Sequence, residues 1–182
     1  QERRDLDGAE VLLRRAVETA PFDADALCGL AEFLSTERRD VDAAEELYKR
    51  AAEGSPSDGD AVCDYARFVI QERRDRVRAE ALFKQAVERN PHGADPLLSY
   101  ASFLSEEKRE LDAAEDLYKR AAEAWPHDPQ VLSDYGNFLL RERRNLDGAE
   151  ALFRRSAASN PRDLDALDEL EAFLAKERRR RP

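Results

Sequence analysis

The chain has 182 residues, of which 42% are hydrophobic and 38% are charged, and its formal net charge is −10. This hydrophobic content supports a folded core under a charged surface and argues against disorder. The net negative charge disfavours direct binding of nucleic acid, which needs an electropositive footprint. No stretch reaches the roughly 18 apolar residues of a membrane-spanning helix. We therefore expect no membrane insertion and an intracellular protein, cytoplasmic or, as the alternative, nuclear.

The two cysteines, Cys28 and Cys63, lie 35 residues apart. Packed helices are about 8–10 Å apart, whereas the Cα atoms of a disulfide lie within about 7 Å, so we expect no disulfide between them. Free thiols favour a reducing compartment. The chain begins at Gln1 and contains no Met, so we interpret it as a fragment of a longer protein.

An Ala-Glu pair returns at a fixed interval of 35 residues. The alanines of these pairs are Ala9, Ala44, Ala79, Ala114 and Ala149. A period of this length is the signature of an array of stacked repeats, so we expect one array over residues 1–182.

Each repeat carries two apolar patterns with the i, i+3, i+4, i+7 spacing of a helix face, such as Val62, Tyr65, Ala66 and Val69. We call the helices of the two patterns first helices and second helices. The pattern predicts ten helices over residues 8–20, 25–37, 43–53, 60–72, 78–89, 94–107, 113–124, 129–142, 148–158 and 164–178.

Helix-end residues support this reading. We expect capping boxes in which an Asp is the N-cap, at Asp7, Asp42, Asp112 and Asp147. The third repeat reads Asp75-Arg76-Val77-Arg78 instead, which predicts the loss of its cap. Prolines close the second helices at Pro21, Pro56, Pro91, Pro126 and Pro161.

Small residues mark the helix crossings and the ends of the array. We expect Ala31, Ala66, Ala101 and Gly136 on first helices to face Ala16, Ala51, Ala86 and Ala121 on second helices. Glu171 stands in the Ala31 place of the last helix, so 164–178 should be a solvent-facing cap. Residues 1–4 match 71–74, the end of a first helix, so the apolar face of 8–20 should be uncovered. An upstream repeat or a neighbouring chain would bury it.

The motif running through Tyr65-Ala66, Ala79, Phe83, Ala86 and Pro91 resembles the tetratricopeptide repeat, and the resemblance covers essentially the whole chain. It implies an all-α, right-handed α-solenoid of stacked helical hairpins. The usual unit has 34 residues, and we place the extra residue in the loop inside each repeat. Tyr100-Ala101-Ser102-Phe103-Leu104 also resembles the half-a-tetratricopeptide variant of RNA-processing factors. That variant has a Trp in its first helix, whereas Trp125 ends a second helix.

No residue pattern points to catalysis. His92 and His127 both follow a repeat-closing proline, where an exposed turn residue is expected. Neither paired metal-ligand spacing nor a phosphate-binding glycine loop occurs. We expect a non-enzymatic protein without cofactor or metal.

The family resemblance places first helices on a concave surface, so we expect a peptide or a helix of a protein partner to bind there. The predicted groove residues are Cys63, Arg67, Ile70, Leu98, Ser102, Ser133, Asn137, Leu140 and Arg141. The alternative is that these positions are merely solvent-exposed. Only Arg67, Asn137 and Arg141 suit the Lys, Asn and Arg clamp with which some family members hold a carboxylate, so a chaperone-tail adaptor is disfavoured.

Basic side chains recur in the loop inside each repeat, and stacking would align them along one edge. This basic edge comprises Arg38, Arg39, Arg73, Arg74, Arg76, Arg78, Lys108, Arg109, Arg143 and Arg144. Helix-end chemistry explains such placement, because bases favour helix C-termini. The sharper hypothesis is an acidic partner. The sequence thus predicts a protein-interaction scaffold; the alternatives are an RNA-processing assembly factor and a self-stacking structural array.

Overall fold

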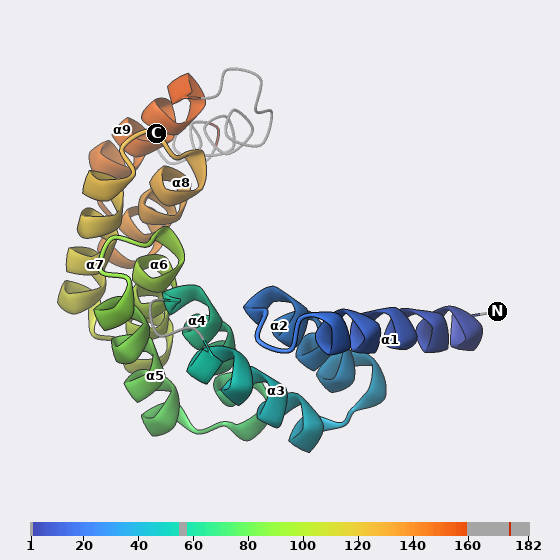
Figure 1. Ribbon diagram of the computed structural model, residues 1–182. Helices are drawn as coiled ribbons and strands as arrows, with labels where there is room; N and C mark the ends of the chain where they lie inside the picture. Colours follow the sequence, from blue (N-terminus) through green and yellow to red (C-terminus); the bar gives the residue numbers. More distant parts are fainter. Residues whose placement is uncertain (1, 55–57, 160–174, 176–182) are drawn as a thin grey trace. The chain divides into compact units, whose positions relative to one another are not determined.

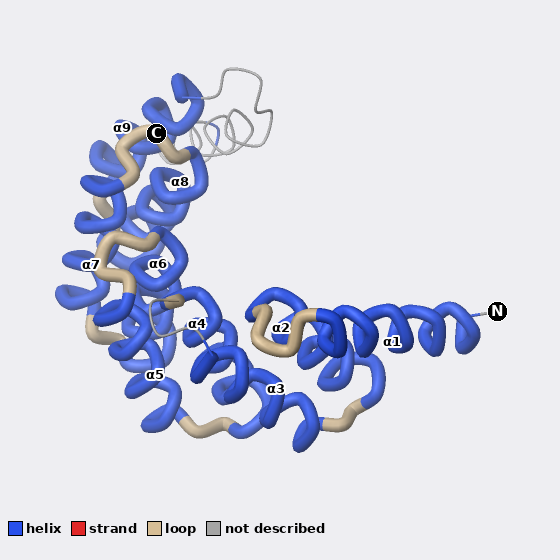
Figure 2. Tube along the Cα trace, in the orientation of Figure 1, coloured by secondary structure: helices blue, strands red, loops and turns tan. Residues whose placement is uncertain are grey.

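The computed structural model describes residues 2–54, 58–159 and 175, and in this part of the chain every regular element is a helix (Figures 1 and 2). The α-helices are α1 (Glu2–Thr19), α2 (Ala24–Phe33), α3 (Val41–Gly54), α4 (Gly59–Phe68), α5 (Arg76–Arg89), α6 (Ala94–Phe103), α7 (Leu111–Ala124), α8 (Pro129–Phe138) and α9 (Leu146–Ser159). The predicted all-α class is confirmed. The predicted closing helix at 164–178, with Glu171, lies outside the described residues apart from residue 175.

The chain divides into two compact units, residues 1–96 and 97–182. In unit 1, α1 packs on α2, α2 on α3, α3 on α4 and α4 on α5. Most of the predicted small residues of this unit are buried: Ala31, Ala66 and Ala86 completely, and Ala51 with 1% exposed. Ala16, predicted to face Ala31, is exposed instead. A methyl group at each crossing lets two helix backbones approach while larger neighbours fill the remaining volume.

In unit 2, α7 packs on α8 and α8 packs on α9. Gly136 of α8 lies against the ring of Phe153 of α9, and a Cβ added to it would meet three ring carbons at 2.9–3.2 Å. Because Gly136 has no Cβ, the Phe153 ring can lie directly against the backbone of α8. The glycine thus makes room for an aromatic ring of α9, whereas its predicted contact with Ala121 stays a prediction.

Each first helix that is described to its end closes in a π turn. These turns are η1 (Leu34–Arg38), η2 (Val69–Arg73), η3 (Leu104–Lys108) and η4 (Leu139–Arg143). A left-handed arginine follows each turn, as at Arg39 with φ of 58°, and the amide of Asp40 then donates to the carbonyl oxygen of Leu34 at 3.0 Å. A π turn spans one residue more than an α turn. It accounts for the extra residue of the 35-residue unit, which the sequence analysis placed in the following loop.

The N-caps of the second helices differ from the prediction. Asp40, Asp75 and Asn145 accept hydrogen bonds from backbone amides three residues further on, at 3.0–3.1 Å. Asp42 is already the second residue of α3, so the predicted capping boxes are wrong, and the third repeat keeps a cap at Asp75. The preceding turn ends one residue later than predicted, and the left-handed arginine that follows it turns the chain so sharply that the cap lies two positions upstream of the predicted one.

Helix α1 starts at Glu2, six residues before the predicted start, and its apolar face is open. Val11 is 65% exposed and Leu12 is 68% exposed, whereas Leu47, one period after Leu12, is 9% exposed. The expectation of an uncovered face agrees with these values. What covers it stays a hypothesis. Cys28 and Cys63 are free thiols, as expected.

Candidate functional site

A groove runs between α2 and α4 in unit 1 and has a volume of about 530 Å³. Its lining residues come from α2, η1, α3, α4 and η2, and they are Asp25, Cys28, Gly29, Glu32, Ser35, Thr36, Tyr48, Asp64, Arg67, Phe68, Gln71 and Glu72. The rings of Tyr48 and Phe68 pack together, with their centroids 5.0 Å apart. First helices thus frame a hollow that has two packed aromatic rings in its wall.

The structure places only part of the predicted groove set in accessible positions. Arg67 lines the groove, but Cys63 is fully buried, so it cannot touch a peptide. Ser133 is 8% exposed and its hydroxyl lies 3.1 Å from that of Ser156, so it serves the contact between α8 and α9 instead. These two assignments are wrong. Ile70, Leu98, Ser102, Asn137 and Leu140 are half-buried and Arg141 is exposed, and their role stays a prediction.

Arg67 is held by carboxylates of its own unit. Its guanidinium donates to Asp64 at 2.5 Å and to both carboxylate oxygens of Asp95 at 3.0 and 3.2 Å. Burial would lower the pKa of Arg67, but Asp95 and Asp64 outweigh burial and raise it. Because two carboxylates already use these donors, Arg67 is poorly placed to clamp a partner's carboxylate.

The groove is acidic. Four carboxylates, Asp25, Glu32, Asp64 and Glu72, line it with a single guanidinium. Only Asp64 makes an ion pair, with Arg67; among the described residues Asp25, Glu32 and Glu72 have no cationic partner. Asp25 and Glu32 belong to the first helix α2 but were not among the predicted site residues. The acidic residues of this helix were the signal available in the sequence.

The thiol of Cys28 reports the same negative environment. Burial, followed by the charge of Asp64 and a hydrogen bond to it, raises the pKa of Cys28 to about 12. The thiol is therefore neutral near pH 7 and is a poor nucleophile. The arrangement suits binding through charge and aromatic contact, not covalent chemistry.

The predicted basic edge is largely used within the chain. The first base of three loops reaches back by one repeat to a Glu and an Asp of a second helix: Arg38 to Glu10 and Asp7, Arg73 to Glu45 and Asp42, and Arg143 to Glu115 and Asp112. The distance from the arginine Nε to the glutamate is 2.6 or 2.7 Å in all three. These pairs join consecutive repeats.

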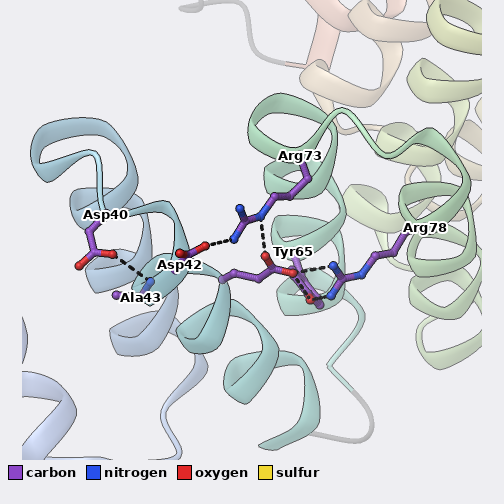
Figure 3. A network of polar contacts seen from close by, with 7 residues as sticks. Asp40, Asp42, Ala43, Tyr65, Arg73 and Arg78 are labelled. Atoms are coloured by element: carbon purple, nitrogen blue, oxygen red, sulfur yellow. Dashed lines mark hydrogen bonds and ion pairs between the residues drawn. The ribbon is translucent and has the colours of Figure 1, made fainter.

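Glu45 is the centre of the largest of these clusters. Figure 3 labels three of its partners, Arg73, Arg78 and Tyr65. Its carboxylate accepts from Arg73 Nε at 2.6 Å, from Arg78 at 2.5 Å and from the Tyr65 hydroxyl at 3.2 Å. The guanidinium of Arg78 also lies over the Tyr65 ring, 5.1 Å from its centroid. Arg73 and Arg78, which the sequence analysis offered to an acidic partner, are therefore occupied by this chain's own carboxylate.

Two further bases of the basic edge also bind carboxylates of the chain. Lys108 pairs with Glu110 at 2.7 Å, and Arg109 pairs with Glu142 at 2.7 Å. Within the described residues Arg39, Arg74 and Arg144 are exposed and make no ion pair. These three arginines remain accessible to an acidic partner, and the binding of such a partner there stays a prediction.

Other sites are not indicated in the described part of the chain. No group of three or more His, Cys, Asp or Glu side chains there is arranged to hold a metal ion. None of its helices has the length and apolarity needed to cross a membrane. His92 and His127 are both exposed, as predicted for turn residues.

The stacked helical hairpins define this chain as a helical-repeat protein of the α-solenoid class. The sequence profile of the tetratricopeptide repeat matches residues 1–59, 71–129 and 106–163, and the chain belongs to that family. This confirms the resemblance drawn from the repeat motif. No curated protein matches the chain at the sequence level.

Solved structures share the fold at low identity. TTC0263, a thermophilic tetratricopeptide protein of Thermus thermophilus, has a TM-score of 0.74 and 23% identity over 93% of this chain and 91% of its own. Yeast Tom70 has a TM-score of 0.74 and 21% identity over 96% of this chain and 38% of its own. YrrB, described as having an unusual peptide-binding site, has a TM-score of 0.57 and 17% identity over 92% of this chain and 84% of its own.

Proposed function

We propose that this chain is a non-catalytic protein-interaction scaffold that binds a short extended peptide of a partner in the groove between α2 and α4. The tetratricopeptide fold indicates such a scaffold in general terms. YrrB, which shares the fold, is described as having a peptide-binding site. The particular groove and its occupant are our proposal.

The observation that carries the proposal is the groove itself. Its volume of about 530 Å³ lies within the range of roughly 300–1,000 Å³ that is typical of small-ligand sites. Such a volume accepts a few side chains of an extended peptide. The packed rings of Tyr48 and Phe68 supply an apolar surface, and the surrounding polar side chains supply orientation. Recognition of extended segments by fixed pockets is a common mode of peptide binding.

Selection from a phage-displayed library of random heptapeptides tests the proposal. The strongest selected peptide is synthesised, and its affinity is measured for the intact chain and for two variants. Gln71 is exposed and lines the groove, so Gln71→Trp should fill the groove and weaken binding at least tenfold. Gln85 is exposed on α5 and outside the groove, so Gln85→Trp should leave the affinity within a factor of two.

Two results would overturn the proposal. Equal affinities of the two Trp variants would place the peptide elsewhere on the chain. Repeated selection without any enriched peptide would remove the groove as a peptide site. Thermal unfolding followed by circular dichroism checks that both variants keep the helical fold.

A further inference from the structure

The charge of the groove points to the chemistry of its occupant. Glu32 and Ser35 lie three residues apart at the end of the first helix, a spacing that puts side chains on one helix face. Asp25 lies at the start of α2 and Glu72 lies in η2, so carboxylates without a cationic partner among the described residues are present along the length of the groove. A cation would bind to these carboxylates, whereas an anion would be repelled.

Two buried hydroxyl groups that line the groove lack hydrogen-bond partners in the described part of the chain. Ser35 is 5% exposed and Tyr48 is 8% exposed, and neither side chain makes a hydrogen bond to any described residue. Buried hydroxyls nearly always have a partner, and leaving one unpaired costs roughly 1–3 kcal/mol. Two such groups beside one hollow are free to accept hydrogen bonds from a ligand that binds there.

The corresponding positions of unit 2 show how this chain pairs the counterpart of the Ser35 hydroxyl. Ser105 and Tyr118 are the residues two periods after Ser35 and Tyr48. Ser105 donates to the carbonyl oxygen of Ser102 at 3.0 Å. Ser102 corresponds to Glu32. Unit 1 thus has a carboxylate where unit 2 has a serine, and only in unit 2 does the serine hydroxyl three residues further on have a partner among the described residues.

We propose that the groove between α2 and α4 recognises a basic peptide, and that a Lys or Arg side chain of this peptide places its cation beside Glu32, Ser35 and Tyr48. The proposal rests on the proposed function and names the chemistry of its partner. The cation's N–H groups donate to the glutamate carboxylate and to the two hydroxyl oxygens, all of which accept hydrogen bonds. Asp25 and Glu72 attract further basic residues of the same segment.

Arg67 does not compete for this role. Its donors are directed to Asp64 and Asp95, so its charge is balanced inside unit 1. A metal ion is also disfavoured as the occupant, since the described residues contain no group of three carboxylates, cysteines or histidines that could hold one. The occupant that fits the remaining charges and hydroxyls is an organic cation with several N–H donors.

Titration of the ¹⁵N-labelled chain with three blocked pentapeptides, followed by NMR, tests the proposal. The peptides are acetyl-Ala-Ala-Arg-Leu-Ala-amide and its versions with Gln and with Glu in place of Arg. The Arg peptide should shift the amide signals of Glu32, Ser35 and their neighbours and should bind about fivefold more tightly than the Gln peptide, as one charge contact predicts. The Glu peptide should bind more weakly than both.

A variant that copies unit 2 makes the test specific. Glu32→Ser should weaken the Arg peptide about fivefold and change the Gln peptide by less than twofold. Glu46→Ser removes the same charge from an exposed position of α3 outside the groove and should change neither affinity. The two variants have the same net charge, so a difference between them cannot come from overall charge.

The outcomes separate this proposal from the proposed function. If the Glu or Gln peptide shifts the same signals and binds at least as tightly as the Arg peptide, the basic-peptide proposal is overturned and peptide binding in the groove stands. An Arg-peptide affinity that Glu32→Ser leaves unchanged overturns it as well. If none of the three peptides moves the signals of α2 and α4 at millimolar concentration, both proposals fail.

Discussion

Replacement of Glu45 by Ala should destabilise unit 1 more than any other single charge removal on the basic side of the repeats. The carboxylate is 16% exposed and accepts from Arg73, Arg78 and Tyr65. Two partly exposed ion pairs contribute about 0.5–1 kcal/mol each. The lost acceptor of the buried Tyr65 hydroxyl adds about 1 kcal/mol. We expect Glu45→Ala to lower the free energy of unfolding by about 2–3 kcal/mol.

The equivalent substitution in unit 2, Glu115→Ala, is the comparison for the loss caused by Glu45→Ala. Glu115 stands two periods after Glu45 and accepts from Arg143 and Lys119, at 2.6 and 2.8 Å. One partly exposed pair, with Arg143, and one exposed i,i+4 pair, with Lys119, predict a loss of about 1 kcal/mol for Glu115→Ala. Urea unfolding followed by far-ultraviolet circular dichroism measures both losses. Glu46→Ala, an exposed neighbour on α3, is the control and should cost less than about 0.5 kcal/mol.

The pH dependence gives a second readout. Burial would raise the pKa of Glu45, but the hydrogen bonds from Arg73 and Arg78 outweigh burial and lower it below the usual value of 4.5. A carboxylate with a lowered pKa stabilises the fold above its unfolded pKa, and this stabilisation is lost as the pH falls through the folded value. Wild type should therefore lose stability below about pH 5 more steeply than Glu45→Gln. If Glu45→Ala costs no more than Glu46→Ala, and Glu45→Gln follows the wild-type pH curve, the cluster contributes nothing and our reasoning is refuted.

Three further measurements test other parts of the structure. Leu12→Ala should lower the free energy of unfolding by less than about 0.5 kcal/mol and Leu47→Ala by about 2–5 kcal/mol, because Leu12 is 68% and Leu47 is 9% exposed. Urea unfolding measures both losses. Equal losses, with a loss for Leu12→Ala that depends on protein concentration, would show that a second chain covers α1. Arg74→Gly should relieve a left-handed backbone with φ of 57°, and so raise the free energy of unfolding by about 1 kcal/mol and raise the thermal midpoint. Arg109→Gly should raise both by less, because it also loses the ion pair with Glu142; a larger rise for Arg109→Gly would contradict this. Cys28 should react with Ellman's reagent about a thousandfold more slowly than a free thiol at pH 8, since its pKa is about 12 instead of 9; a rate near that of free cysteine would show that the groove is neither buried nor acidic.

The stacking of the hairpins could be predicted because each repeat carries the same information five times. Ala66 alone does not predict a helix contact. Ala31, Ala66 and Ala101 recur every 35 residues, and this recurrence predicts which helix faces pack together. The structure buries all three completely. Helix ends were less predictable, since Asp40 and Asp42 are equally good N-caps by residue type. The choice between them depends on the left-handed backbone of Arg39, which no residue preference announces, because arginine rarely adopts it.

The site was predictable only in outline. Cys28 and Cys63 occupy the same place in two adjacent repeats, yet Cys28 lines the groove and Cys63 is fully buried. Burial depends on tertiary neighbours, and periodicity does not describe them. The pairing of Arg73 with Glu45 was accessible in principle, because three arginines of the basic edge lie 28 residues after a glutamate. A repeat period aligns like positions of successive repeats, and it does not by itself show which opposite charges meet between them.

The affinity of two peptides for two proteins tests the central claim of an acidic groove most directly. The proteins are the wild-type chain and its Glu32→Lys variant, and the peptides are the blocked Arg and Glu pentapeptides. Wild type should prefer the Arg peptide, and Glu32→Lys should prefer the Glu peptide, because the charge beside Ser35 and Tyr48 changes sign. The same preference in both proteins, or no preference in either, would contradict the assignment of the groove between α2 and α4 as a site for a basic partner.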